Sequence, residues 1–310
     1  MDEPNESIWF DPVGWTSRDY LNMPQPIPSG YGEIDRHLCG GFRPGVYTIL
    51  GRPGEGKSAL AIAMMERIAS RGEPAAIVSL EMPAADAWLR CASAHSVQNK
   101  EVPQFAWSAA GSHSDASVRF GGKHLSTGED PIITAGRVMS RMPLFITAPE
   151  EPNIDVVLDR LVRANDKGAR IAVLDYLQLI DVPGIDREYE RVSAATRAVV
   201  NLAKSLKMAI IVIAAMNREG LTGSASMHSA AGSSLIEYAS TCVMTYVRDK
   251  DAQGDEGTRT MNLNIEKNRS GMVTLEPIRM TYWPAFNCVI EEKTWLGIKA
   301  KKSAASAAAK

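Results

Sequence analysis

Residues 51–58 are the segment that most constrains the fold of this 310-residue chain. They read Gly-Arg-Pro-Gly-Glu-Gly-Lys-Ser and match the phosphate-binding pattern G-x-x-x-x-G-K-[ST]. In such a loop, backbone N–H groups surround the α- and β-phosphates of a nucleotide. The lysine reaches the β- and γ-phosphates, and the hydroxyl binds Mg²⁺. The pattern therefore predicts a nucleoside triphosphate ligand and a loop placed between a strand and a helix.

The flanking segments have that character. Residues 46–50 (Val-Tyr-Thr-Ile-Leu) are apolar and partly β-branched, which indicates a strand, and residues 58–69 are helix formers with a broad apolar face. The start of that helix adds unpaired N–H groups and a partial positive charge. The residues expected to bind the nucleotide are Gly51, Arg52, Pro53, Gly54, Glu55, Gly56, Lys57, Ser58 and Ala59.

The rest of the chain alternates between short apolar strands and amphipathic helices. Strands are expected at 75–80, 144–147, 170–175 and 209–215, and helices at 86–98, 154–167 and 187–206. This alternation predicts an α/β fold with a mostly parallel sheet covered on both faces. After residue 242 the pattern changes to strands alone, at 242–247, 261–267, 273–278 and 288–290. We expect these to finish one edge of the sheet as antiparallel strands.

Composition divides the chain into three parts. Residues 1–26 are polar and end in a Pro-rich stretch, which indicates an arm or linker, and residues 27–295, which contain the P-loop, are expected to form one nucleotide-binding domain. Residues 296–310, rich in Lys, Ala and Ser, are expected to be a disordered basic tail. The N-terminus lacks an apolar signal segment, the longest apolar run is too short to cross a membrane, and the four cysteines form no CxxC pair. We therefore expect a cytoplasmic protein without a membrane partner.

Two acidic residues stand where a P-loop enzyme needs them. Asp175 ends the apolar strand at 170–175, and an acid in this position holds Mg²⁺ together with the loop hydroxyl, here Ser58. Glu81 follows the strand after the P-loop helix. Because ligands bind beyond the carboxyl ends of parallel strands, Glu81 is a candidate general base that activates the attacking water.

The order of these features resembles one family. The strings Ser79-Leu-Glu-Met82, Asp175-Tyr-Leu-Gln-Leu179, Met216-Asn-Arg218 and Glu266-Lys-Asn-Arg-Ser-Gly271 resemble, in order and spacing, the ATPase motor domain of the replicative DnaB-type DNA helicases. The resemblance extends over about residues 27–290. It implies a RecA-like fold and a hexameric ring that moves on single-stranded DNA with ATP and Mg²⁺, in a bacterium or in a phage or plasmid of one. A primase or a helicase loader is an implied partner.

The resemblance also implies roles for individual residues. Lys57 and Ser58 bind phosphate and Mg²⁺, Asp175 holds the metal and Glu81 is the general base. Lys267 and Arg269 project into the site of the neighbouring subunit, and their spacing of two places both on one face of a strand. An arginine that arrives from another subunit suits the charge of the transferring phosphoryl group.

Loops that face the ring channel hold DNA in this family. The matching segments are about 182–191 and 218–234, so the expected DNA contacts are Arg187, Arg191, Arg218, Ser224 and Ser226. The net charge of −2 means that any attraction for DNA must come from such local groups. The second loop is almost uncharged and offers mainly hydroxyl and backbone N–H groups.

The chain departs from the family at two places. Ala215 stands where family members have a glutamine that senses the γ-phosphate, and an alanine side chain cannot hydrogen-bond a phosphate. Residues 1–26 cannot form the family's N-terminal helical domain. A motor domain without that helical domain is typical of phage or plasmid relatives. Two alternatives to a helicase follow: a RecA-type DNA-dependent ATPase that acts as a loader, recombination or replication accessory, and an ATP-binding assembly protein without turnover.

Overall fold

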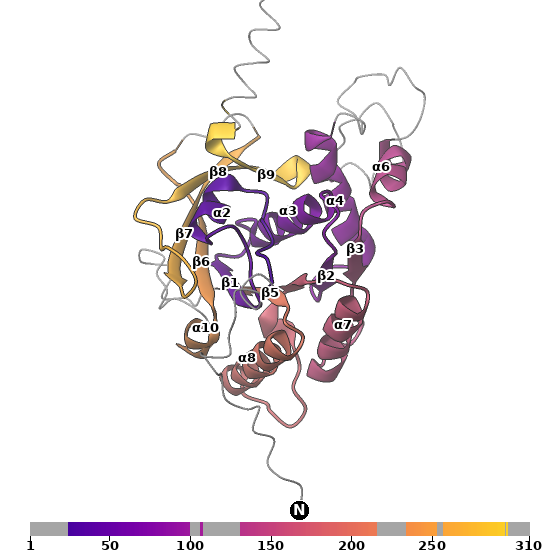
Figure 1. Cartoon of the computed structure of the whole chain (residues 1–310), viewed down its shortest axis with the longest axis vertical. Helices are drawn as coiled ribbons and strands as arrows, with labels where there is room; N and C mark the ends of the chain where they lie inside the picture. Colours follow the sequence, from indigo (N-terminus) through magenta and orange to yellow (C-terminus); the bar gives the residue numbers. More distant parts are fainter. Residues whose placement is uncertain are drawn as a thin grey trace, which may run out of the picture.

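One mixed sheet forms the centre of the molecule (Figure 1). The computed structural model describes residues 24–99, 106–107, 131–215, 234–252, 257–294 and 296. Within this part of the chain, nine strands pair in the order β3-β2-β4-β5-β1-β6-β7-β8-β9. The neighbours from β3 to β6 run parallel, as the alternating pattern predicted. Their bounds are β1 Gly45–Gly51, β2 Ala75–Ser79, β3 Leu144–Thr147, β4 Ile171–Asp175, β5 Ala209–Ala215 and β6 Cys242–Arg248.

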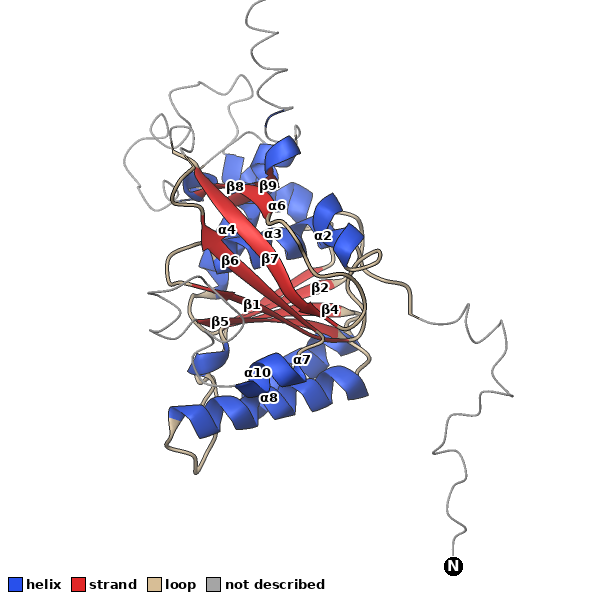
Figure 2. Cartoon of the chain, turned by 90° about the vertical axis from the view of Figure 1, so that its left-hand side faces the viewer, coloured by secondary structure: helices blue, strands red, loops and turns tan. Residues whose placement is uncertain are grey.

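Helices cover both faces of the sheet (Figure 2). Successive side chains of β1 point to opposite faces of the sheet, and both faces are apolar. Ile49 packs in the hydrophobic cluster that contains the α3 side chains, and Leu50 packs in the cluster that contains those of α8. The α3 side includes α2 Gly32–His37, α3 Lys57–Ala69, α4 Ala84–Gln98 and α6 Pro131–Met139. The opposite side includes α7 Ile154–Asp166, α8 Glu188–Ser205 and α10 Ser234–Ala239. No helix among the described residues is long and apolar enough to cross a lipid bilayer.

The C-terminal strands finish the sheet as antiparallel neighbours, which confirms that part of the expectation. They are β7 Arg259–Asn268, β8 Ile278–Trp283 and β9 Cys288–Glu291, and a short 3-10 turn, η5 Pro284–Phe286, joins the last two. The strand expected at 273–278 is wrong, because β8 begins only at Ile278. Val273 and Leu275 alternate as strand residues would, but both are exposed, and Pro277 has no N–H for a ladder bond.

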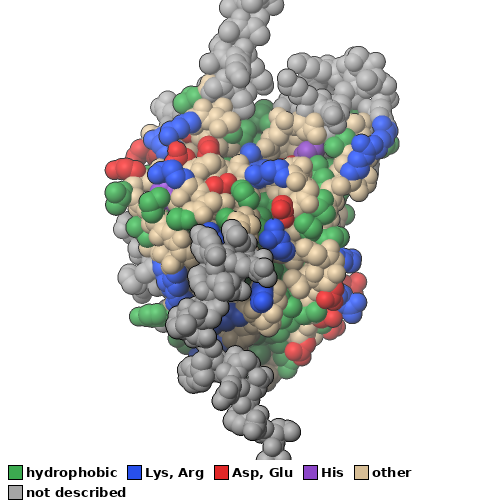
Figure 3. Space-filling view, in the orientation of Figure 1, with side chains coloured by type: hydrophobic (Ala, Val, Ile, Leu, Met, Phe, Trp, Pro, Cys, Tyr) green, Lys and Arg blue, Asp and Glu red, His purple; other side chains and the backbone are tan. Residues whose placement is uncertain are grey.

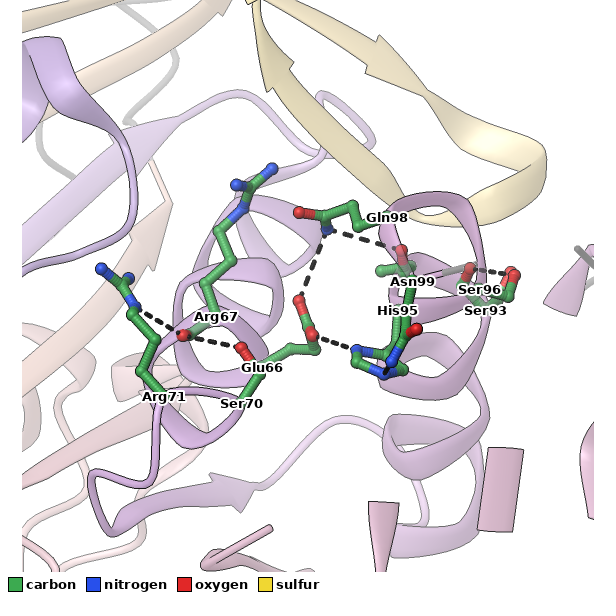
Figure 4. A network of polar contacts seen from close by, with 10 residues as sticks. Glu66, Arg67, Ser70, Arg71, Ser93, His95, Ser96, Gln98 and Asn99 are labelled. Atoms are coloured by element: carbon green, nitrogen blue, oxygen red, sulfur yellow. Dashed lines mark hydrogen bonds and ion pairs between the residues drawn. The ribbon is translucent and has the colours of Figure 1, made fainter. Parts of the chain in front are cut away.

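A buried polar network joins α3 to α4 (Figure 4). Glu66 and His95 are 2% and 4% exposed, and His95 Nδ1 lies 2.6 Å from Glu66 Oε1. The second ring nitrogen of His95 lies 2.8 Å from Asn99 Nδ2, and Gln98 Nε2 donates to Glu66 Oε2 at 3.4 Å. Each buried polar group of this pair therefore has a partner, and the network sets the position of α4 relative to the helix that begins at the P-loop.

Candidate nucleotide site

A cavity of about 450 Å³ lies at the carboxyl ends of the parallel strands. The P-loop follows β1 directly, while Glu81 and Asp175 lie at or just beyond the ends of β2 and β4. Strand pairing brings these ends together, because β2 pairs with β4 and β4 with β5, which pairs with β1. The expected site residues that line the cavity are Pro53, Gly54, Gly56, Lys57, Ser58, Ala59, Glu81 and Asp175. Of the other expected P-loop residues, Gly51 is the last residue of β1, and Glu55 accepts a hydrogen bond from the backbone N–H of Arg52 at 3.2 Å.

The P-loop backbone depends on glycine at two positions. Gly54 and Gly56 have φ values of 74° and 89°, in the left-handed region that disfavours residues with a Cβ atom. Gly56 is the N-cap of α3, so the N–H groups of the first helical turn open toward the cavity. A Cβ atom on Gly56 would lie 2.7 Å from Cε1 of Tyr282, which packs behind the loop. The loop therefore presents backbone donors and a helix N-terminus to an anion.

The side chain of Lys57 lies along the loop that it follows. Its Nζ donates to the carbonyl oxygens of Gly51 at 2.9 Å and Arg52 at 3.0 Å. Burial lowers the pKa of Lys57, and the charges of Asp175, Glu55 and Glu81 act in the opposite direction, Asp175 most strongly. The ammonium group is thus at the cavity wall with three acids near it, in position to bind phosphate oxygens.

Asp175 and Ser58 fit a magnesium ion. The Ser58 hydroxyl lies near the Asp175 carboxylate at the same cavity, and the Oδ1 atom of that carboxylate is buried and has no hydrogen-bond partner. Burial raises the pKa of Asp175 to about 6; the nearby Ser58 hydroxyl opposes this rise and the charge of Glu81 adds to it. A hydroxyl and a carboxylate oxygen are the hard ligands that Mg²⁺ prefers. A cation here would give the unpartnered carboxylate oxygen a ligand and favour its charged form.

Glu81 lies in a tight turn after β2. The Ser79 hydroxyl donates to the Met82 carbonyl at 2.7 Å and accepts from the Met82 N–H at 3.2 Å, which closes the turn around Glu81. The Glu81 side chain is exposed and lines the cavity. A solvent-accessible carboxylate beside the phosphate-binding loop is suited to accept a proton from a water molecule.

Other cavity residues were missed by the sequence reasoning. They are Met82, Arg90, Tyr176, Ile213 and Tyr282. Of these, Arg90, Tyr176 and Tyr282 carry polar groups; Arg90 comes from α4, Tyr282 comes from β8, and Tyr176 follows β4. Arg90 could have been suspected, because it lies two helical turns beyond Glu81, but β8 is more than 200 residues from the P-loop and no local pattern links Tyr282 to it.

Ala215 ends β5 and lines the cavity, so its position in the site agrees with the alignment of motifs. The side-chain amide of Gln178 lies beside it. Gln178 Nε2 contacts the Ala215 carbonyl at 3.5 Å, and its Oε1 is 3.5 Å from the Ala215 N–H. An amide group is thus present at this strand end, but it belongs to η3 Leu177–Leu179 and contacts the backbone of Ala215.

Lys267 and Arg269 are not among the cavity residues of their own subunit. Lys267 is in β7, and Arg269 follows its last residue. Lys267 Nζ donates to the Tyr238 carbonyl at 3.1 Å, and Arg269 Nη2 donates to the same oxygen. Because both cations reach one acceptor in the last turn of α10, they lie side by side on the surface.

The expected DNA-contacting residues divide into two groups. Arg187 and Arg191 lie at the start of α8, where Arg187 is exposed and its Nη1 is 3.3 Å from Glu190 Oε1. Arg218, Ser224 and Ser226 lie outside the described residues. On the face shown in Figure 3, Lys and Arg side chains are interspersed with acidic ones.

Comparison with known proteins places these features in one family. The model of the DnaB-like helicase C terminal domain matches residues 26–287. Among curated relatives, the replicative DNA helicase DnaB of Geobacillus stearothermophilus is 26% identical over 257 residues, which are 80% of this chain and 53% of the relative. DnaB of Treponema pallidum is 29% identical over 254 residues, 80% of this chain and 52% of the relative. The chain thus spans about half the length of these two helicases.

Solved structures agree on the fold. The ATPase domain of G40P superposes with a TM-score of 0.70 at 18% identity, over 89% of this chain and 95% of that domain. A DnaB-like replicative helicase, described with its interactions with primase, superposes with a TM-score of 0.71 at 18% identity, over 88% of this chain and 63% of the helicase.

Proposed function

The chain belongs to the DnaB-like helicase C-terminal domain family, and from this premise we propose that it is an ATP-driven helicase motor that hydrolyses ATP with Mg²⁺ and moves on single-stranded DNA. The observation that best supports this proposal is the shared cavity of Lys57, Ser58, Glu81 and Asp175. These residues come from three separate strand ends, and together they supply a phosphate cradle, a metal site and a base.

Each residue has a defined task in the proposed reaction. Lys57 and the first turn of α3 bind the phosphates, and Ser58 and Asp175 hold the magnesium ion, which supplies positive charge to the phosphate oxygens. Glu81 accepts a proton from the water molecule that attacks the terminal phosphorus. The carboxyl ends of β2 and β4 hold the base and the metal ligand near each other because these strands are paired.

The site is proposed to be completed by a neighbouring subunit in a hexameric ring. Lys267 and Arg269 are together on the surface and outside their own cavity, as groups that act on another subunit must be. In the ring, Lys267 and Arg269 donate to phosphate oxygens in the neighbouring subunit's site and no longer to the Tyr238 carbonyl. An arginine provided in this way stabilises the charge of the transition state.

Single-stranded DNA is proposed to bind at the start of α8, through Arg187 and Arg191, and at the segment with Arg218, Ser224 and Ser226. The mixed charge of the face shown in Figure 3 favours such a local site over a broad basic band there. A primase or a helicase loader is the proposed protein partner. Because ATP and DNA are both present in the bacterial cytoplasm, that is the proposed compartment.

One measurement tests the proposal directly: the ATPase rate and the native mass, with and without single-stranded DNA. A ring whose ATPase is stimulated by DNA supports it, and a monomer without turnover contradicts it. The accessory ATPase remains the second candidate because Ala215, without a side-chain hydrogen-bonding group, ends β5 in the cavity. Strand displacement on a forked duplex separates the two, since only the helicase unwinds it.

A further inference from the structure

Arg90 in α4 presents a cation to the nucleotide cavity with part of its hydrogen-bonding capacity unused. It lines the cavity, and its Nε atom is buried and has no hydrogen-bond partner. The guanidinium thus shares the cavity with Lys57, Ser58, Glu81 and Asp175. A guanidinium offers five N–H donors in a planar fork. Such a group at a phosphate-binding loop is suited to an anionic ligand.

Trp107 holds this guanidinium in place. The Arg90 Cζ atom lies 4.2 Å from the centroid of the Trp107 rings, which is the geometry of a cation–π contact. Trp107 is itself fixed at both ends. Its backbone N–H donates to Ser93 Oγ at 3.1 Å, and its indole Nε1 donates to the Pro284 carbonyl at 2.8 Å. The indole therefore bridges α4 and the turn between β8 and β9.

The same turn also supports the P-loop. Tyr282, at the end of β8, packs against Gly56. Pro284, two residues later, accepts the hydrogen bond from Trp107. The position of the P-loop and the position of Trp107 are thus set by one segment, which fixes the distance between the loop and the cation stacked on Trp107.

We propose that Trp107 is a positioning residue of the nucleotide site, which holds the Arg90 guanidinium against the terminal phosphate of a bound nucleoside triphosphate. Lys57 and α3 approach the phosphates from the loop, whereas Arg90 comes from the helix that begins after Glu81, on the side where the base is. A cation in that position contacts the γ-phosphate and makes the site prefer triphosphate over diphosphate. The inference rests on the proposed function only in taking a nucleoside triphosphate at the P-loop as the ligand.

Equilibrium binding of two nucleotides tests the assignment. The dissociation constants of the intact protein for a non-hydrolysable ATP analogue and for ADP, both with Mg²⁺, are measured by calorimetry. We expect Trp107→Ala to weaken binding of the analogue about 3- to 10-fold, the range of a lost cation–π contact, and to leave ADP binding unchanged. Trp107→Phe keeps a ring under the guanidinium and should retain most of the preference for the ATP analogue over ADP. Arg90→Ala should abolish this preference.

Two further variants show whether Trp107 acts through Arg90. The double variant R90A/W107A should bind the analogue no more weakly than R90A alone, because the two residues form one unit. Trp283→Phe is the matched control, since Trp283 stacks on Phe286 in the same turn and is not among the cavity-lining residues. It should keep the wild-type preference.

The result that would overturn the proposal is an equal loss of ATP-analogue and ADP affinity in Trp107→Ala, or no loss of either. Additive effects in the double variant would also overturn it. A wild type that binds the analogue but does not hydrolyse ATP contradicts the proposed function and leaves this binding test fully readable. A wild type that binds neither nucleotide contradicts both.

Discussion

The hydroxyl of Ser58 lies near the carboxylate of Asp175, where the first turn of α3 meets the last residue of β4 at one cavity. The two residues are 117 positions apart in the chain, yet they line the same cavity at the place where a magnesium ion is expected. The Oδ1 atom of the Asp175 carboxylate is buried without a hydrogen-bond partner. A buried carboxylate of this kind has a stability cost that can be measured.

We expect Asp175→Asn to stabilise the nucleotide-free protein while it abolishes Mg²⁺-dependent ATP hydrolysis. Burial raises the pKa of Asp175 from its ordinary value of 3.8 to about 6. The folded state therefore holds this proton more tightly than the unfolded state, and wild-type stability falls as the pH rises from 4 to 6. A pKa shift of this size lowers the free energy of unfolding of the wild type by on the order of 2 to 3 kcal/mol above pH 6.

Urea unfolding at pH 4.5 and pH 7.5 provides the measurement for this variant. The gain in the free energy of unfolding should be largest at pH 7.5, where the wild-type carboxylate is charged, and small at pH 4.5, where it is mostly protonated. A gain of the same size at both pH values would show that the buried charge is not its source.

Glu81→Gln should stop hydrolysis without preventing nucleotide binding. Glutamine has nearly the same size but cannot accept the proton from the attacking water, so the rate should fall at least about 100-fold. The side chain is exposed, so the thermal stability should change little. The comparison is between the ATPase rate and the dissociation constant for ATP. A variant that still hydrolyses ATP at the wild-type rate would remove Glu81 from the mechanism.

Arg269→Ala should lower turnover by about 1,000-fold if the guanidinium completes the site of a neighbouring subunit. Mixing Arg269→Ala with Lys57→Ala subunits should then restore part of the activity, because some interfaces combine an intact P-loop with an intact arginine. The assay is the ATPase rate after subunit exchange. Arg163→Ala is the control, since Arg163 is exposed on α7 and pairs with Asp159. Absence of rescue in exchanging mixtures would argue against a role in another subunit.

His95→Leu should destabilise the fold by on the order of 3 kcal/mol, because it leaves the buried carboxylate of Glu66 without the closer of its two partners. The double variant Glu66→Leu/His95→Leu should recover most of this loss, since neither polar side chain then remains buried without its partner. Unfolding in urea measures both. A double variant as unstable as the single one would mean that packing volume, and not the unpaired charge, is responsible.

Much of the nucleotide site follows from local sequence. The P-loop of residues 51–58 needs a strand before it and a helix after it, and both are readable from apolar periodicity within a few residues. Asp175 and Glu81 are also predictable, because the carboxyl ends of parallel strands lie at one edge of a sheet. The structure brings these residues together at one cavity, and their placement was predictable because each depends on a short pattern and on one general rule of topology.

Other features depend on contacts between segments that are distant in the chain. The strand predicted at 273–278 is wrong because pairing with β7, and not the alternation of Val273 and Leu275, decides where β8 begins. Tyr282 packs behind Gly56, and Trp107 stacks on Arg90, only because the antiparallel strands place the end of β8 beside the P-loop and α4. The sequence alone thus predicted the class of ligand and the groups that are proposed to bind its phosphates. The tertiary structure decided which distant side chains surround them, because burial and side-chain contact depend on position in space and leave no local pattern in the chain.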